Sequence, residues 1–161
     1  MTRSLTVTWE DPLATFEEGR KMARPIDYLR ALRDGKLPPP PIARLLGMGL
    51  VEVEEGRAVF AVMPGEQHYN PIGVVHGGLA FTLLDSAMGC TVQTMLPAGK
   101  AYTTLEMKAN LVRAITLKTG SIRAIGKIVH MGRQTATAEG RIEDAEGKLY
   151  AHGTTTCIIM G

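Results

Sequence analysis

One carboxylate stands out in the segment from Asn70 to Leu96, NPIGVVHGGLAFTLLDSAMGCTVQTML. Between Glu66 and Lys100, Asp85 is the only residue expected to be charged at neutral pH. The apolar residues of this segment fall all around a 3.6-residue helical wheel, which predicts a buried helix. A carboxylate on such a helix is costly unless it is paired, hydrogen-bonded or open to a cleft where it has a function. Asp85 is therefore the first candidate for a catalytic residue.

A structural role for Asp85 is the alternative. In that case the hydroxyls of Thr82 or Ser86 would satisfy a buried carboxylate. Ionised carboxylates are rarely placed on apolar helices for stability, so the functional interpretation is favoured. Ser86 lies in Asp-Ser-Ala rather than in a nucleophile elbow, which argues against a serine hydrolase.

The His76-Gly77-Gly78 tripeptide stands where this helix is expected to begin. The first backbone N–H groups of a helix have no internal partner and lie at the positive end of its dipole. Glycine lets a carbonyl oxygen approach them without meeting a Cβ. The tripeptide is thus a candidate oxyanion hole for an acyl compound. The alternative is a turn that sterically requires glycine.

The spacing of these two features predicts that they act in different subunits. Asp85 follows His76 by nine residues, which is roughly 13 Å of axial rise on a helix. A carboxylate that far along cannot act on a group held at the start of the same helix. If both belong to one reaction, they must come from two subunits of an antiparallel dimer.

Two further polar positions lie close to this segment. Asn70, six residues before His76, has an amide suited to orienting water or binding a thioester carbonyl, or it is only a turn residue before Pro71. Thr104, in Tyr102-Thr103-Thr104 after the helix, has a hydroxyl that could position water, or it is an ordinary strand threonine. The remaining histidines have no metal-ligand spacing, and we expect no metal site.

The bulk composition excludes several classes of protein. A chain of 161 residues fits one domain with one core. The net charge of +2, the lack of a basic stripe and 5% aromatic residues argue against a nucleic-acid partner. No signal peptide and no membrane-spanning stretch is recognised, and Cys90 and Cys157 are expected to be free thiols. We therefore expect a soluble, cytoplasmic protein with no membrane partner.

The order of elements predicts an α+β fold. Residues 48–54 and 57–63 read as a hairpin, and four extended segments joined by short turns follow the central helix as an antiparallel meander. One sheet curling around one helix would bury that helix on most sides. Residues 1–44 read as an N-terminal helical extension, and 45–161 as the main domain. The expected strands after the helix are 101–111, 119–130, 134–143 and 149–159.

The segment around His76 and Asp85 resembles a known family. HGGLAFTLLDSAMG, with Asn70 six residues before the His and Asp85 nine after it, resembles the signature of hotdog-fold acyl-CoA thioesterases of the phenylacetic-acid-degradation (PaaI-like) type. The segments LLGMGLVEVEEGRAVFAV, TTLEMKANLVRAI and VHMGRQTATAEGRIEDAEGKLYAHGT also resemble that family. The resemblance runs from about Leu45 to Ile159. It implies about six antiparallel strands wrapped around one long helix, in homodimers with a continuous sheet and often in homotetramers.

The resemblance also implies roles for individual residues. The Gly77 N–H would polarise the thioester carbonyl, and Asp85 of the other subunit would act as general base or nucleophile. Asn70 and His76 would orient the carbonyl or the water, with Thr104 beside the acid. Gly78, Gly132 and Arg133 would contact the substrate, Arg133 through the phosphates of coenzyme A.

The implied activity is hydrolysis of an acyl- or aryl-acyl-CoA to the free acid and coenzyme A. Coenzyme A enters as part of the substrate, and no metal or redox cofactor is needed. A non-catalytic acyl-CoA sensor is the main alternative, and a hydratase is disfavoured because no histidine follows Asp85 within the helix. One departure from the family pattern is Ala114 after Arg113, where the family often has Arg-Pro. We expect it to affect the end of the strand rather than the site.

Overall fold

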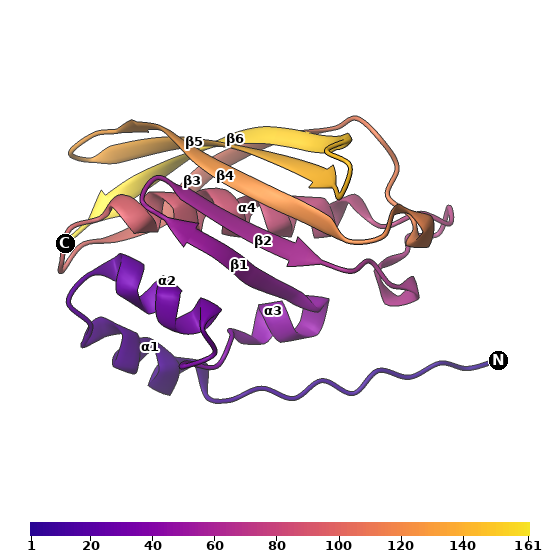
Figure 1. Ribbon diagram of the computed structural model, residues 1–161, viewed down its shortest axis with the longest axis horizontal. Coiled ribbons are helices and arrows are strands. Elements are labelled where there is room, and N and C mark those ends of the chain that lie inside the picture. Colours follow the sequence, from indigo (N-terminus) through magenta and orange to yellow (C-terminus); the bar gives the residue numbers. More distant parts are fainter.

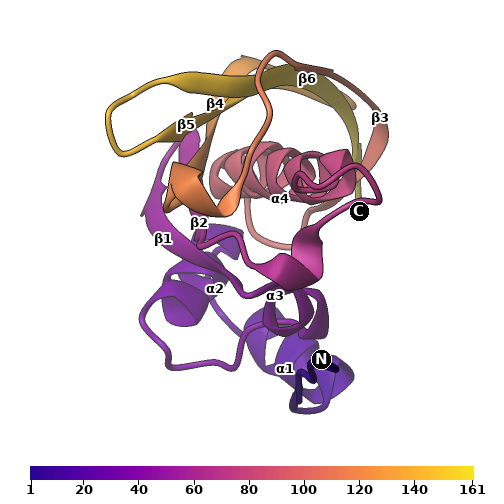
Figure 2. The same cartoon turned by 90° about the vertical axis from the view of Figure 1, so that its right-hand side faces the viewer.

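The computed structural model describes residues 1–161 and contains one curled antiparallel sheet wrapped around a long helix, α4 (Gly77–Met95). Three shorter helices, α1 (Pro12–Arg20), α2 (Pro25–Arg33) and α3 (Pro41–Leu46), lie on the open side of the sheet (Figures 1 and 2). The α+β class and the six strands expected from the sequence are confirmed. The strands are β1 (Met48–Glu54), β2 (Arg57–Val62), β3 (Ala101–Leu111), β4 (Ile122–Met131), β5 (Thr135–Asp144) and β6 (Leu149–Met160).

The order of strands in the sheet corrects the expected meander. The spatial order is β1-β2-β4-β5-β6-β3, and every pair is antiparallel. β3 pairs with β6 instead of β4, because the connection from residue 112 to 121, with its short 3-10 turn, crosses from one edge of the sheet to its middle. β3 is thus an edge strand, paired on one side only.

Local sequence signals explain where the helices begin and end. Asp11 caps α1, because its side chain accepts hydrogen bonds from the N–H groups of Leu13 and Ala14. Pro25 starts α2, as proline favours the first helical position. Gly47 ends α3 in the left-handed conformation, at φ 63°.

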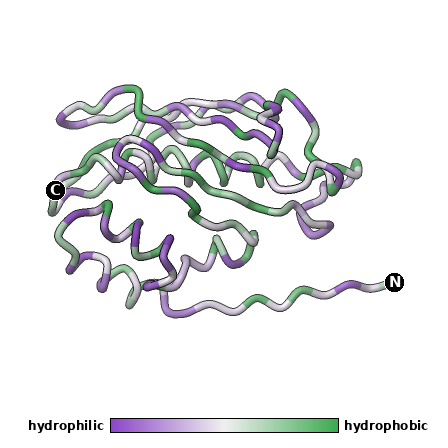
Figure 3. The backbone as a smooth tube through the Cα atoms, viewed as in Figure 1, coloured by the Kyte–Doolittle hydropathy of each residue, from purple (hydrophilic) through white to green (hydrophobic).

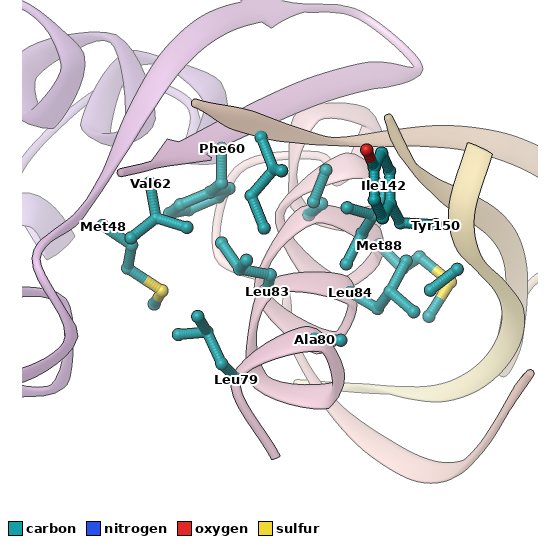
Figure 4. Packing of buried hydrophobic residues seen from close by; sticks show 14 of the residues in the cluster. Met48, Phe60, Val62, Leu79, Ala80, Leu83, Leu84, Met88, Ile142 and Tyr150 are labelled. Carbon is teal, nitrogen blue, oxygen red and sulfur yellow. The ribbon is translucent and has the colours of Figure 1, made fainter. Parts of the chain in front are cut away.

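The main core lies between α4 and the concave face of the sheet. Leu83 of α4 faces Phe60 and Val62 of β2, while Leu84 and Met88 face Ile142 of β5 (Figure 4). Hydropathy alternates along the strands because successive side chains point to opposite faces of the sheet (Figure 3). None of the helices is both long enough and apolar enough to span a membrane.

The N-terminal helices attach to this core through α2. Ile26 and Leu29 are fully buried and pack with Val53 of β1 in a small second cluster. α1 buries none of its residues, and α3 spans the expected domain boundary at residue 44. The division into 1–44 and 45–161 stays a prediction.

Candidate active site

The side chains of Asp85 and Thr104 meet where α4 passes behind β3. The Thr104 hydroxyl donates a hydrogen bond to Asp85 Oδ1 over 3.0 Å. The β3–β6 ladder shifts register between Thr104 and Glu106. Before the bulge the half-buried residues of β3 are Tyr102 and Thr104, and after it they are residues 107 and 109. The alternation of half-buried and exposed side chains therefore shifts by one residue at the bulge. Such bulges re-aim side chains, and here the bulge ends the stretch that presents Thr104 to α4.

Asp85 is exposed in the single chain, although α4 is buried on most sides as expected. Phe81, one turn earlier, is 37% exposed, so α4 has an uncovered face along the unpaired edge of the sheet. The expected structural partners of Asp85 are wrong, since Thr82 donates to the carbonyl of Gly78 instead. The helical wheel could not predict the uncovered face of α4, because it shows which residue types lie on each face and not which face the sheet covers.

The start of α4 presents one free backbone donor. His76 is the N-cap, and its Nδ1 accepts a hydrogen bond from the Gly78 N–H over 2.8 Å. The Leu79 N–H donates to the His76 carbonyl. With the N–H groups of Gly78 and Leu79 both bonded, the N–H of Gly77 is the one that has no partner within the chain. Since Nδ1 is an acceptor, the neutral His76 ring carries its proton on Nε2, which lets it donate a second hydrogen bond. Gly77 and His76 therefore offer donors, whereas the Gly78 N–H is already used.

The Asn70 side chain shapes the loop before this helix. Its Oδ1 accepts hydrogen bonds from the N–H groups of Ile72 and Val74, as in an Asx turn. The Val75 N–H in turn donates to the carbonyl of Ile115, which fixes the loop to the β3–β4 connection. Asn70 is therefore a turn residue, one of the two alternatives given by the sequence, and it acts through its side-chain oxygen. Its amide NH₂ makes no hydrogen bond in the chain.

A cavity of about 290 Å³ opens at the start of α4. It brings together Asn70, His76 and Gly77, and it also contains Arg113 and Tyr150. The Arg113 guanidinium donates to the Leu149 carbonyl over 2.5 Å and stacks over the Tyr150 ring. Ala114, the departure from the family pattern, lines the same cavity, so its effect is not confined to the end of the strand as expected.

Within one chain this cavity and the Asp85–Thr104 pair stay apart. Neither Asp85 nor Thr104 lines the cavity. Asp85 follows Gly77 by eight residues on the same helix, which is about 12 Å of axial rise. A single chain therefore holds two half-sites, one with donors and one with a carboxylate.

Gly132 and Arg133 lie at the other end of the molecule. They form the β4–β5 turn, on the side where α4 ends (Figure 1). The Gly132 N–H donates to the Thr135 carbonyl, and a Cβ on Gly132 would lie 2.9 Å from that oxygen, so this tight turn suits glycine. Arg133 is exposed, and one chain does not bring it near His76.

The residues around Asp85 include no thiolate nucleophile. Burial raises the pKa of the Cys90 thiol to about 12, and the negative charge of Asp85 adds to the rise. Burial also raises the pKa of Tyr102 well above its ordinary value. Cys90 and Cys157 are free thiols. The structure contains no group of three or more His, Cys, Asp or Glu residues arranged to hold a metal ion.

Comparison with known proteins gives consistent matches. Residues 72–151 match the family model of the thioesterase superfamily. ComA2 of Bacillus subtilis, a protein named as a putative esterase, is 31% identical over 117 residues, which are 71% of this chain and 90% of that protein. The 1,4-dihydroxy-2-naphthoyl-CoA hydrolase of Listeria monocytogenes is 28% identical over 114 residues, covering 71% of this chain and 91% of the relative.

A solved structure agrees with these matches. A mutant of the phenylacetic acid degradation protein PaaI from Thermus thermophilus superposes with a TM-score of 0.67 at 28% identity. The superposition covers 74% of this chain and 98% of the other.

Proposed function

This chain belongs to the thioesterase superfamily and is a thioester hydrolase, and we propose that it hydrolyses acyl-CoA at a site shared by two subunits. The observation that carries the proposal is the Asp85 carboxylate, hydrogen-bonded to Thr104 and exposed beside an unpaired strand edge. The hydrolase named for 1,4-dihydroxy-2-naphthoyl-CoA among the relatives supports a CoA thioester as the substrate. Coenzyme A is then part of the substrate, and water is the co-substrate.

The free edge of the sheet supports a dimer. β3 is eleven residues long and pairs only with β6, so its other edge is open, and Leu105 on it is 57% exposed. Long exposed apolar edges readily pair with another strand. Antiparallel pairing of two β3 strands about a two-fold axis would extend the sheet and lay the two α4 helices side by side.

The position of Phe81 supports the register of that dimer. Phe81 lies four residues after Gly77 and four before Asp85. If the two-fold axis passes at Phe81, Gly77 of one helix stands level with Asp85 of the partner subunit. The exposed Phe81 rings would then be covered by each other.

We propose the following roles for the site residues. The free N–H of Gly77 polarises the thioester carbonyl, and Asp85 of the partner subunit removes a proton from water as the water oxygen attacks that carbon. The tetrahedral oxyanion stays hydrogen-bonded to Gly77. The C–S bond then breaks, and the proton passes from Asp85 to the departing sulfur, giving a carboxylic acid and coenzyme A.

The other residues position these groups. Thr104 holds one oxygen of Asp85 and leaves the other for water. His76 Nε2 and the Asn70 amide face the carbonyl or the water as donors, and Arg113 closes the cavity. Arg133 of the partner subunit is the candidate contact for the CoA phosphates, since the two-fold axis brings the end of one α4 toward the start of the other.

The test is Asp85→Asn, with Glu139→Gln on an exposed position of β5 as the matched carboxylate control. General base catalysis contributes about 10²–10⁴-fold, so kcat for thiol release should fall by at least about 100-fold in Asp85→Asn only. Sedimentation should show both variants in the same assembly as the wild type. A kcat within tenfold of wild type in Asp85→Asn would contradict the proposed base. Binding of acyl-CoA by the wild type without thiol release would favour the sensor instead.

A further inference from the structure

The walls of the cavity at the start of α4 are mostly apolar. Val75 and Ala80 contribute to them from the loop and the helix, and Leu111 and Ile115 from the end of β3 and the segment after it. The volume of about 290 Å³ lies at the lower limit of the range of roughly 300–1,000 Å³ that is typical of ligand pockets. The cavity therefore suits a short acyl group better than a long fatty acyl chain.

One cation and no acidic side chain lines this cavity. The cation is Arg113, and Arg113 and Arg133 are the two arginines of the chain that take part in no salt bridge. The Asp144 carboxylate accepts a hydrogen bond from the Tyr150 hydroxyl over 3.0 Å, but it forms no salt bridge with Arg113 and does not line the cavity. The positive charge of Arg113 is therefore left without a carboxylate in direct contact.

Two contacts hold the Arg113 guanidinium in position. It donates a hydrogen bond to the Leu149 carbonyl, and it stacks over the Tyr150 ring at 5.7 Å from the ring centroid. A guanidinium has several N–H donors in a planar fork, and the Leu149 carbonyl is the one acceptor that Arg113 meets within the chain. The remaining donors suit a carboxylate, which a guanidinium binds in a bidentate pair.

Ala114 adds a backbone donor beside this cation. It lines the same cavity, and its N–H makes no hydrogen bond within the chain. A proline at this position would have no N–H. The replacement of the Arg-Pro pattern by Arg113-Ala114 therefore gives this cavity a further donor for an anion.

The separation between Gly77 and Arg113 indicates which anion fits. The Leu111 side chain packs on Gly77, since a Cβ on Gly77 would lie 2.6 Å from Leu111 Cδ1. Arg113 follows Leu111 by two residues, and two residues span at most about 7 Å of chain. A carbonyl bound at Gly77 is therefore only a few carbon atoms away from the reach of Arg113. The phosphates of coenzyme A are separated from the thioester by the whole pantetheine arm, which is longer than this separation.

Resting on the proposed function, we propose that this cavity selects an acyl group that ends in a second carboxylate. The preferred substrate is then the CoA thioester of a short dicarboxylic acid, such as glutaric acid. The thioester carbonyl is bound at Gly77, and the distal carboxylate accepts hydrogen bonds from the Arg113 guanidinium and the Ala114 N–H. Arg113 determines specificity and takes no part in the chemical step.

The test compares glutaryl-CoA with pentanoyl-CoA, whose acyl group has the same number of carbon atoms and no charge. Thiol release is corrected for the rate without enzyme, since the distal carboxylate of glutaryl-CoA can attack its own thioester. Arg113→Gln removes the charge and keeps an amide donor for the Leu149 carbonyl, whereas Arg113→Lys keeps the charge. Arg141→Gln, at an exposed position of β5 outside the cavity, is the matched control.

The wild type and Arg141→Gln should prefer glutaryl-CoA in kcat/KM by at least about tenfold, since a hydrogen bond to a charged group contributes about that factor or more. Arg113→Gln should lose this preference, and Arg113→Lys should retain part of it. Equal kcat/KM for the two substrates in the wild type would overturn the inference while the hydrolase proposal stands. A KM raised equally for both substrates in Arg113→Gln, with an unchanged preference, would also overturn it and assign Arg113 to the phosphates of coenzyme A.

Binding separates this inference from the catalytic proposal. The Kd values of the non-hydrolysable thioether analogues of glutaryl- and pentanoyl-CoA are measured by calorimetry. Tighter binding of the glutaryl analogue, lost in Arg113→Gln, supports the carboxylate site even if no thioester is cleaved. Equal binding of both analogues to the wild type would count against the carboxylate site.

Discussion

The Thr104 hydroxyl donates to Asp85 Oδ1 over 3.0 Å, across the junction between an edge strand and the central helix. This contact fixes one carboxylate oxygen and leaves the second for water. It also joins two residues that are nineteen positions apart in the chain.

Thr104→Val removes the hydroxyl and keeps the shape of the side chain. With Asp85 no longer held, kcat should fall by at least about tenfold, and KM should change little, because a hydrogen bond to a charged group contributes about 1.5–3 kcal/mol and each 1.4 kcal/mol is a factor of ten. Thr104→Ser restores the hydroxyl and should recover most of the activity. Steady-state thiol release measures all three proteins. Equal activity of the Val and Ser variants would show that the contact has no role in turnover.

Leu105→Arg should weaken the proposed dimer. Leu105 is 57% exposed at the bulge of the edge strand, and an arginine there would place a charge in the proposed β3–β3 interface. Sedimentation velocity should show a shift toward monomer, with activity lost in parallel, because the half-sites separate. Val129→Arg is the control, since Val129 is 58% exposed on β4, in the middle of the sheet. An active monomer of Leu105→Arg would contradict the shared site.

Gly126→Ala should destabilise the fold more than Gly140→Ala. A Cβ on Gly126 would lie 2.4 Å from the Ala87 carbonyl oxygen of α4. Because that oxygen belongs to the helix backbone, it cannot easily move away to relieve the clash. A Cβ on Gly140 would meet the Met88 side chain at 2.8 Å, which is flexible. Overpacking typically costs about 1–3 kcal/mol, and we expect the upper part of that range for Gly126→Ala. Urea unfolding measures both, and the reverse order would contradict the close helix–sheet contact.

His68 should make stability depend on pH in the mildly acidic range. Burial lowers the pKa of the His68 imidazole below its ordinary 6.5, because the charged form is desolvated. The unfolded chain therefore binds a proton first as the pH falls. The free energy of unfolding is highest above about pH 6.5 and decreases as the pH falls through that value toward the lower folded pKa.

Urea unfolding from about pH 7.5 to about pH 5.5 measures this effect. His68→Gln should flatten the pH dependence, whatever its effect on the absolute stability. His152→Gln, at an exposed position of β6, should keep the slope of the wild type. The carboxyls with lowered pKa values, such as Asp144, lose their contribution only at lower pH, near 4 or below, so they do not affect this window. A wild-type slope in His68→Gln would assign the effect to another group.

The sequence by itself determined the elements and the candidate residues. The Glu55-Gly56 hairpin, the helix after His76 and the stop at Pro97 follow from local turn, cap and periodicity rules, which act between neighbours in the chain. Asp85 was identified because a single charge in a long apolar segment is costly wherever that segment lies. These inferences need no knowledge of the rest of the fold.

Only the tertiary structure decided how these parts meet. β3 lies beside β6 instead of β4, and a bulge determines that Thr104 faces Asp85. The same non-local pairing leaves the Asp85 face of α4 uncovered, and Arg113 lines the cavity because the β3–β4 connection turns there. Strand order, register and bulges depend on contacts between segments far apart in the chain. Residue periodicity shows which residues prefer to be buried, whereas the packing of the sheet determines which of them are.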